Sequence, residues 1–162
     1  MPKKLIAFIL GSAFTCGANA AEWYGFASVG LVKAAYFFDW ETIEKRPGGI
    51  TMWLKAVNKE SLPDSDGSYS TATKFTFDCK KRTMQQLIEV LYDKNRDHIR
   101  TSTRVMQAVE VIPGTTGEAA LKVVCAPDFP NKKAQLYAKV GDNDIYAAAK
   151  RLLVISDDPA PK

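Results

Sequence analysis

The stretch KFTFDCKKRTMQQLIEVLYD, residues 74–93, contains the features that decide how this chain folds. Its first part alternates apolar and polar residues, with Phe75 and Phe77 on one face, which is typical of a half-buried strand. That strand runs into Cys79, and a basic run, Lys80-Lys81-Arg82, follows it directly. Two questions arise from the stretch: what the cysteine pairs with, and whether the basic run has a function.

Residues 83–92 have two interpretations. Met84, Leu87, Ile88 and Leu91 have helical spacing. The same segment can equally form a strand in which Leu87 and Leu91 point inward and Ile88 points outward. Intrinsic propensity does not choose between these two interpretations.

The first twenty residues, MPKKLIAFILGSAFTCGANA, differ from the rest of the chain. Lys3 and Lys4 form a short positive start, an apolar run follows, and Ala18-Asn19-Ala20 is a small-x-small pattern. This order predicts a secretory signal peptide over residues 1–20, cleaved after Ala20. The apolar run is shorter than the ~20 residues that a membrane span needs, and no later segment approaches that length.

After removal of the signal peptide, we expect residues 21–156 to form one domain and residues 157–162 to form a disordered tail. The full sequence of 162 residues is long enough for one domain with a real core. Loss of Lys3 and Lys4 leaves 20 basic and 18 acidic residues, a net charge of +2. Such a small net charge does not indicate a nucleic-acid partner.

Export changes the meaning of the three cysteines. Cys16 leaves with the signal peptide, and Thr15 precedes it where a lipid-anchor motif usually has Gly or Ala, so we expect no lipid anchor. The mature chain then holds Cys79 and Cys125, which admit one intramolecular connectivity. A structural disulfide is the interpretation that we adopt, and two buried free thiols are the alternative.

Alternation and turn residues predict the flanking elements. Residues 22–40 predict two short strands, and Pro47 with two glycines marks a turn at 46–49. The segment ITMWLKAV, residues 50–57, predicts a strand that is partly apolar on both faces. The polar segment 58–70 predicts a mobile loop.

The second half of the chain predicts two strands and two helices. Segments 99–102 and 105–112 read as strands. Thr115 and Glu118 have capping-box spacing before an apolar run, which predicts a short helix that ends at Cys125. A last helix follows, capped by Asp142 or Asn143, with one apolar face formed by Ile145, Ala148, Ala149 and Leu152.

Four segments together resemble the surface-adhesin protein E family of exported bacterial domains. They are YFFDWETI, MWLKAV, the stretch at 74–93 and VIPGTTGEAALKVVC, and the resemblance covers residues 33–126. It implies an α+β fold, with a small antiparallel sheet of about five to six strands, one or two packed helices and a Cys79–Cys125 disulfide. It also implies that residues 83–92 are a strand. Residues 131–158 lie outside the family pattern.

The sequence offers no catalytic signature. His98 is the single histidine, and it lies in a polar segment that predicts a solvated turn. A cysteine nucleophile needs a free thiolate, which a Cys79–Cys125 disulfide removes. We therefore expect no enzyme activity, no metal site and no cofactor.

Basic residues concentrate between residues 74 and 104. The candidate binding residues for an anion or a partner are Lys80, Lys81, Arg82, Arg100 and Arg104, which a hairpin of 83–92 with 97–105 would bring together. The alternative is a solvated strand edge that its charges protect against aggregation.

These observations predict an exported, non-catalytic, adhesin-like binding module of the bacterial envelope, located in the periplasm, at the cell surface or outside the cell. The expected partner is a protein or an anionic polysaccharide such as lipopolysaccharide. The alternative function is that of a periplasmic accessory protein of an envelope complex or a stress response, with no host-binding role.

Overall fold

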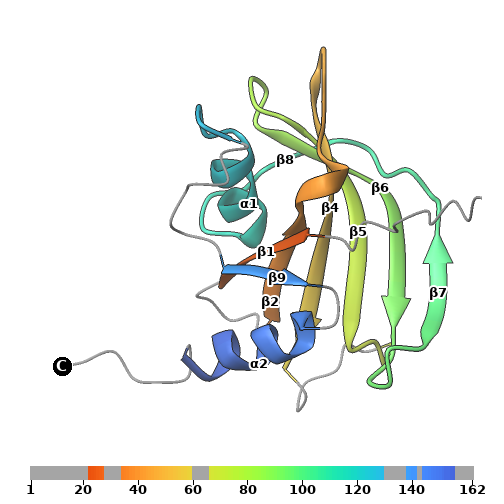
Figure 1. The fold of residues 1–162 in the computed structure, drawn as a ribbon. Coiled ribbons are helices and arrows are strands. Elements are labelled where there is room, and N and C mark those ends of the chain that lie inside the picture. The colour runs from red at the N-terminus through yellow and green to blue at the C-terminus, as the bar shows by residue number, and fades with distance from the viewer. Residues whose placement is uncertain (1–21, 28–33, 60–65, 130–137, 142–143, 156–162) are drawn as a thin grey trace, which may run out of the picture.

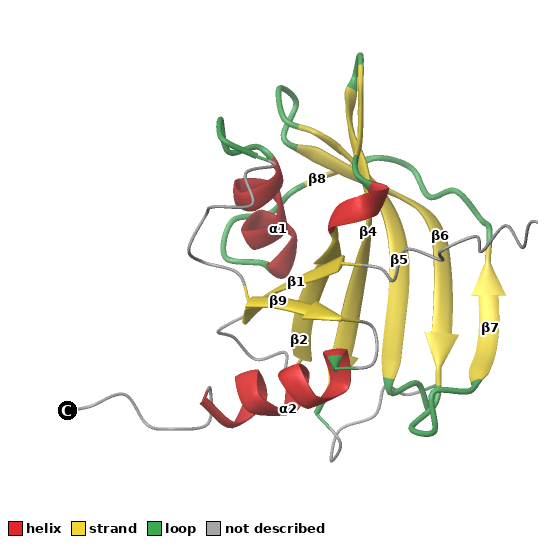
Figure 2. Ribbon diagram, viewed as in Figure 1, coloured by secondary structure: helices red, strands yellow, loops and turns green. Residues whose placement is uncertain are grey.

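One antiparallel β-sheet organises the chain, and a helix lies against each of its faces (Figures 1 and 2). The structure, a computed structural model, describes residues 22–27, 34–59, 66–129, 138–141 and 144–155. The predicted signal peptide, Cys16, the predicted cap at Asp142 or Asn143 and the tail at 157–162 lie outside these residues. None of the described helices is long and apolar enough to span a membrane.

The described elements follow one another as nine strands, two α-helices and one 3-10 helix. The helices are η1 (Trp40–Thr42), α1 (Thr116–Val124) and α2 (Ile145–Ile155). The strands are β1 (Glu22–Ala27), β2 (Ala34–Asp39), β3 (Glu44–Arg46), β4 (Gly49–Asn58), β5 (Ser70–Asp78), β6 (Thr83–Tyr92), β7 (His98–Ser102), β8 (Val109–Glu110) and β9 (Ala138–Gly141).

The strands pair in the order β7-β6-β5-β4-β2-β1-β9, while β3 adds to β4 and β8 adds to β6. All of these pairings are antiparallel. The prediction of an antiparallel sheet with two helices is confirmed, but the prediction of five to six strands is too low. The strands β3, β8 and β9 have only 3, 2 and 4 residues, which is too short for alternation to be recognised in the sequence.

Residues 83–92 form a strand, as the family resemblance implies. Lys74 pairs with Ile88, whereas the next residue, Phe75, pairs with Gln86, so Leu87 is an extra residue in a β-bulge. Leu91 is buried, as predicted. The prediction that Leu87 points inward with Leu91 is wrong, because the bulge interrupts the alternation. Leu87 lies on the opposite face of the sheet, where it lines a polar hollow with Lys74.

The two faces of β4 carry separate hydrophobic cores. Met52 and Leu54 face α1, where they pack with Phe77 and Val124. Val57 belongs to the other core, under α2. This arrangement confirms that the strand is apolar on both faces, as a strand covered on both sides should be.

The helix α2 anchors the C-terminal part of the chain to the sheet. Its Ile145 and Ala149 are buried in the second core, so the predicted apolar face of this helix is confirmed. The Tyr146 hydroxyl lies 2.9 Å from Ser70 Oγ. The Arg96 guanidinium lies 4.3 Å from the Tyr146 ring centroid, and the Lys55 ammonium lies 5.0 Å from it. Cation–π contacts of this kind stabilise the packing of the helix in addition to its buried apolar residues.

The prediction of a strand over residues 105–112 is wrong over most of its length. Only Val109–Glu110 pairs as a strand, and residues 103–108 have no regular structure. Met106 N–H donates to the carbonyl of Gln86, and Val111 N–H donates to that of Arg82, so the segment follows β6 through isolated hydrogen bonds. Val111 is buried in the core, whereas four other apolar residues of the segment are exposed: Val105, Met106, Val109 and Ile112.

The predicted capping box begins α1. Glu118 N–H donates to Thr115 Oγ1 at 3.3 Å, which satisfies one of the unpaired amides of the first turn. The Glu118 carboxylate accepts from Gly114 N–H at 2.9 Å. The pKa of Glu118 is lowered, first by this backbone hydrogen bond and then by Lys122.

Cys125 caps the C-terminal end of α1 and forms the predicted disulfide with Cys79. The two Cα atoms are 5.6 Å apart, and the bond joins residues separated by 46 positions. It ties the end of α1 to the turn between β5 and β6. The alternative of two free thiols is therefore excluded.

Replacing Cys79 with Ser should lower the melting temperature by about 10 °C. The chain-entropy contribution of a loop of this length is ~4 kcal/mol, and each kcal/mol is worth about 3 °C in a domain of this size. Circular dichroism of the unreduced protein measures the change. The Cys79→Ser/Cys125→Ser variant is the control, and its melting temperature should equal that of the single variant. Two titratable thiols in the unreduced, denatured parent would contradict the assignment.

The Glu118 carboxylate should make stability depend on acid pH. Because its pKa is lower in the folded state, it stabilises the fold above the ordinary glutamate pKa of about 4.3. That contribution is lost as the pH falls through the lowered value. Urea unfolding should therefore separate Glu118→Gln from the parent at pH 7, and the difference should narrow as the pH is lowered toward 3. Glu110→Gln, an exposed change on β8, is the control; an equal gap at both pH values would refute the role.

Candidate anion-binding site

The basic run lies in a tight turn that Asp78 holds in shape. Asp78 Oδ1 accepts from the backbone N–H groups of Lys80 and Lys81, both at 3.0 Å. The hydrogen bond from Lys81 N–H is the first cause that lowers the pKa of Asp78. Both lysines are exposed. The turn therefore presents two ammonium groups from a fixed backbone.

The last residue of the run, Arg82, turns toward α1 and away from its predicted neighbour. Its backbone is left-handed, with φ 54°, and its guanidinium lies 3.7 Å from the Glu118 carboxylate. Its carbonyl accepts from Val111 N–H at 2.9 Å. Val111, and not Arg104, is thus the residue beside Arg82.

Arg100 and Arg104 do not join this turn. Arg100 pairs with Leu91 near the far end of β6, and its guanidinium lies 3.7 Å from Asp66. At about 3.3 Å per residue, Arg100 and Arg82 are separated by roughly 30 Å along the strand. Arg104 is exposed in the irregular segment after β7. The structure therefore divides the five predicted residues into a turn at 80–82 and two separate arginines.

Two basic residues that sequence reasoning missed lie beside the turn at 80–82. Lys45 and Arg46 end β3, and they line a hollow of ≈ 570 Å³ together with Lys80 and Lys81. The lining residues come from the β3–β4 hairpin, the β5–β6 turn and the end of α1 with the segment after it. Figure 1 shows where these elements lie. No local motif marks this grouping, because the two pairs of residues are far apart in the sequence.

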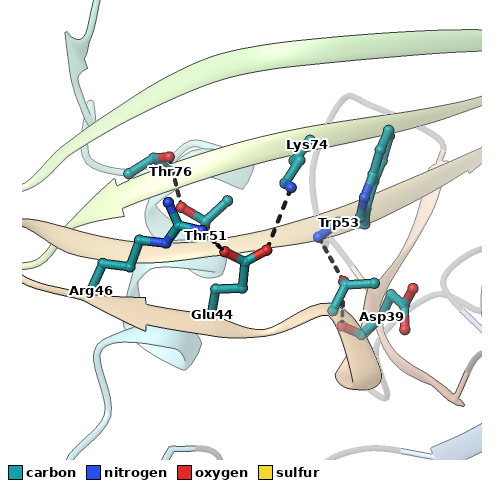
Figure 3. A network of polar contacts seen from close by, with 8 residues as sticks. Asp39, Glu44, Arg46, Thr51, Trp53, Lys74 and Thr76 are labelled. Carbon is teal, nitrogen blue, oxygen red and sulfur yellow. Dashed lines mark hydrogen bonds and ion pairs between the residues drawn. The ribbon is translucent and has the colours of Figure 1, made fainter.

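A polar network fixes the β3 side of this region (Figure 3). The Glu44 carboxylate pairs with Arg46 and with Lys74, whose ammonium lies 3.7 Å away. Between β4 and β5, the hydroxyl oxygens of Thr51 and Thr76 are 2.9 Å apart. These contacts hold the β3–β4 hairpin against β5.

Gly48 allows that hairpin to turn tightly. Its φ of 105° lies in the region that side chains disfavour. At the neighbouring Gly49, an added Cβ would lie 2.5 Å from the carbonyl oxygen of Phe77. Both glycines line the hollow, so part of its wall is backbone without side chains.

Residues 28–126 match the sequence model of the family described as surface-adhesin protein E. This match spans more than half of the chain and includes the turn, the disulfide and most of the residues around the hollow. The chain belongs to the surface-adhesin protein E family. Membership supports an adhesin-like role and an exported or cell-surface location.

Solved structures of Haemophilus influenzae protein E are similar to this chain. Crystal form II of that protein is 18% identical, with a TM-score of 0.43, and the match covers 56% of this chain and 80% of the other. Protein E from non-typeable Haemophilus influenzae is 16% identical, with a TM-score of 0.41, and the match covers 82% of this chain and 87% of the other. No curated protein sequence matches the chain.

The surface-adhesin protein E match ends before the last two described elements. Residues beyond 126 contribute β9, which pairs with β1, and α2, which covers the second core. The described residues beyond the family match therefore extend the same sheet with β9 and cover one of its faces with α2.

The single histidine of this surface-adhesin protein E domain lies far from the hollow, at the start of β7. His98 is exposed, and its Nε2 lies 2.8 Å from Thr101 Oγ1. It is the first residue of β7, so the predicted turn, which included His98, extends one residue too far. Within the described residues, no group of three His, Cys, Asp or Glu side chains converges as a metal site.

Proposed function

We propose that this chain is an exported, non-catalytic binding module of the bacterial envelope, an adhesin that binds an anionic partner through the turn at 80–82. The observation that carries the proposal is the family match over residues 28–126. It supports the adhesin-like role, and the basic turn supplies the chemistry of recognition.

The basic turn is suited to binding because its geometry is set before a partner arrives. The disulfide holds Cys79, and the Asp78 carboxylate holds the next two backbone amides. A turn whose backbone is already ordered loses little backbone entropy on binding. Among the described residues, the Lys80 ammonium has no carboxylate partner, so it is available to a ligand.

The partner that fits such a turn is an acidic protein surface or an anionic polysaccharide, including lipopolysaccharide. Binding should be weak and salt-sensitive, because exposed charges are screened over about 8 Å at physiological ionic strength. The competing role, a periplasmic accessory protein, differs in one testable respect, since an adhesin has to be reachable from outside the cell.

Intact cells should expose this protein to a membrane-impermeant amine-reactive biotin reagent. Its described lysines include exposed ones at Lys80 and Lys81, so a surface-located copy is labelled efficiently. The recovered protein should have the mass of a chain that begins at Ala21. A periplasmic protein released only by osmotic shock is the labelling control. Labelling only after the outer membrane is opened would favour the accessory role.

The Lys80→Ser/Lys81→Ser/Arg82→Ser variant should elute from a heparin column at a lower salt concentration than the parent. The change removes three fixed positive charges from one turn, which weakens attraction to a sulfated chain. The matched control is Lys94→Ser/Arg100→Ser/Arg104→Ser, which removes the same charge elsewhere and should elute close to the parent. Melting curves establish that both variants fold. Equal shifts in the two variants would show that only net charge matters.

A further inference from the structure

We infer that the hollow beside the disulfide binds a small amphiphilic anion, with an apolar group inside and a sulfonate, carboxylate or phosphate at its basic rim. We call this hollow the disulfide hollow; it is the ≈ 570 Å³ space lined by Lys45, Ile50, Lys80, Val124 and their neighbours. The inference rests on the proposed function, because it assigns ligand chemistry to the same basic turn.

The inner part of the disulfide hollow is apolar. Ile50 comes from β4, Val124 from α1 and Phe129 from the segment after α1, and the two disulfide cysteines line the same space. Phe129 is itself packed edge-on against Trp40, with ring centroids 5.6 Å apart. The volume falls within the ~300–1,000 Å³ of small-molecule sites, which are mostly apolar with a few placed polar groups.

The rim is positive on two sides. Lys45 and Arg46 stand on the β3 side, and Lys80 and Lys81 stand on the turn side. Asp78 is the single acidic residue that lines the hollow among the described residues. Its carboxylate is engaged with the turn amides and with Lys81, whose ammonium lies 3.6 Å away. Because Arg46 is already paired with Glu44 and Lys81 with Asp78, the excess positive charge of the rim comes from Lys45 and Lys80.

Lys45 supplies a cation with donors to spare. Its ammonium donates to the carbonyl of Phe129 at 2.6 Å, which ties β3 to the segment after α1. An ammonium has three N–H donors, so this bond leaves others for a ligand. The same contact closes one side of the hollow, which reduces the loss of freedom on binding.

The apolar interior and the basic rim of the hollow together select the class of ligand. A neutral lipid would leave the rim charges without a counterion, and a purely polar anion would leave the apolar floor in water. For comparison, a second hollow of ≈ 210 Å³ near Tyr36, Phe75 and Met84 has no charged residue in its described lining. The disulfide hollow, in contrast, combines an apolar interior with a basic rim.

Fluorescence titration of the mature protein with 8-anilinonaphthalene-1-sulfonate tests the inference, because this probe joins an aryl group to a sulfonate. The parent should bind it saturably. Lys45→Gln/Lys80→Gln should weaken that binding at least fivefold, while the new amide at position 45 retains an N–H donor toward Phe129. The uncharged probe N-phenyl-1-naphthylamine should bind the parent and this variant within twofold of one another.

Lys94→Gln/Arg104→Gln is the matched control, since it removes two exposed charges away from the hollow and should leave sulfonate affinity within twofold. Backbone amide shifts should move at Lys80 and Ala126 on adding the probe, and stay unchanged at Ile99. No saturable binding, equal affinity in the two double variants, or shifts confined to the exposed apolar residues of β7 and β8 would overturn the inference.

The outcomes for the hollow and for the adhesin role are separable. Loss of heparin retention without probe binding would leave the basic turn as a surface contact and remove the hollow. Probe binding by a protein that intact cells do not expose would keep the hollow and remove the adhesin role.

Discussion

The covalent bond between Cys79 and Cys125 is the constraint on which the rest of this arrangement depends. It joins the β5–β6 turn to the end of α1, two segments that share no backbone pairing in the described sheet. On one side of the bond lies the core formed by Met52, Phe77 and Val124. On the other side lies the hollow. The same bond therefore holds the helix on the sheet and fixes the floor of the candidate site.

A sheet covered on both faces explains how a short chain keeps such a site rigid. The α1 core lies on one face, and the α2 core lies on the other. Because α2 lies beyond the family match, this chain completes its second face with residues of its own C-terminal part. Burial on two sides also accounts for the apolar character of both faces of β4, which an antiparallel sheet with one open face would not need.

Local spacing predicted the capping box at Thr115, and the count of two cysteines after export predicted their pairing, whereas the antiparallel sheet was implied by the family resemblance. The sequence did not predict features that depend on contacts between distant segments. The bulge at Leu87 mixes the spacing of strand and helix, so residues 83–92 could be assigned only through the family resemblance. Lys45 reaches the site through a turn elsewhere in the chain, and short strands such as β8 carry too few residues for periodicity to be detected.

Local arrangement, and not net charge, decides whether this protein attracts anions. The full sequence carries a formal net charge of only +4. Many of its cations have a nearby carboxylate, as Arg82 has Glu118 and Arg100 has Asp66. Charges neutralised in pairs produce little field beyond a Debye length of about 8 Å. At the rim of the hollow, Arg46 and Lys81 are paired in the same way, whereas the Lys45 ammonium is bonded to a carbonyl group. A carbonyl group leaves the full positive charge in place, so the excess survives where an apolar floor excludes water and strengthens each ionic contact.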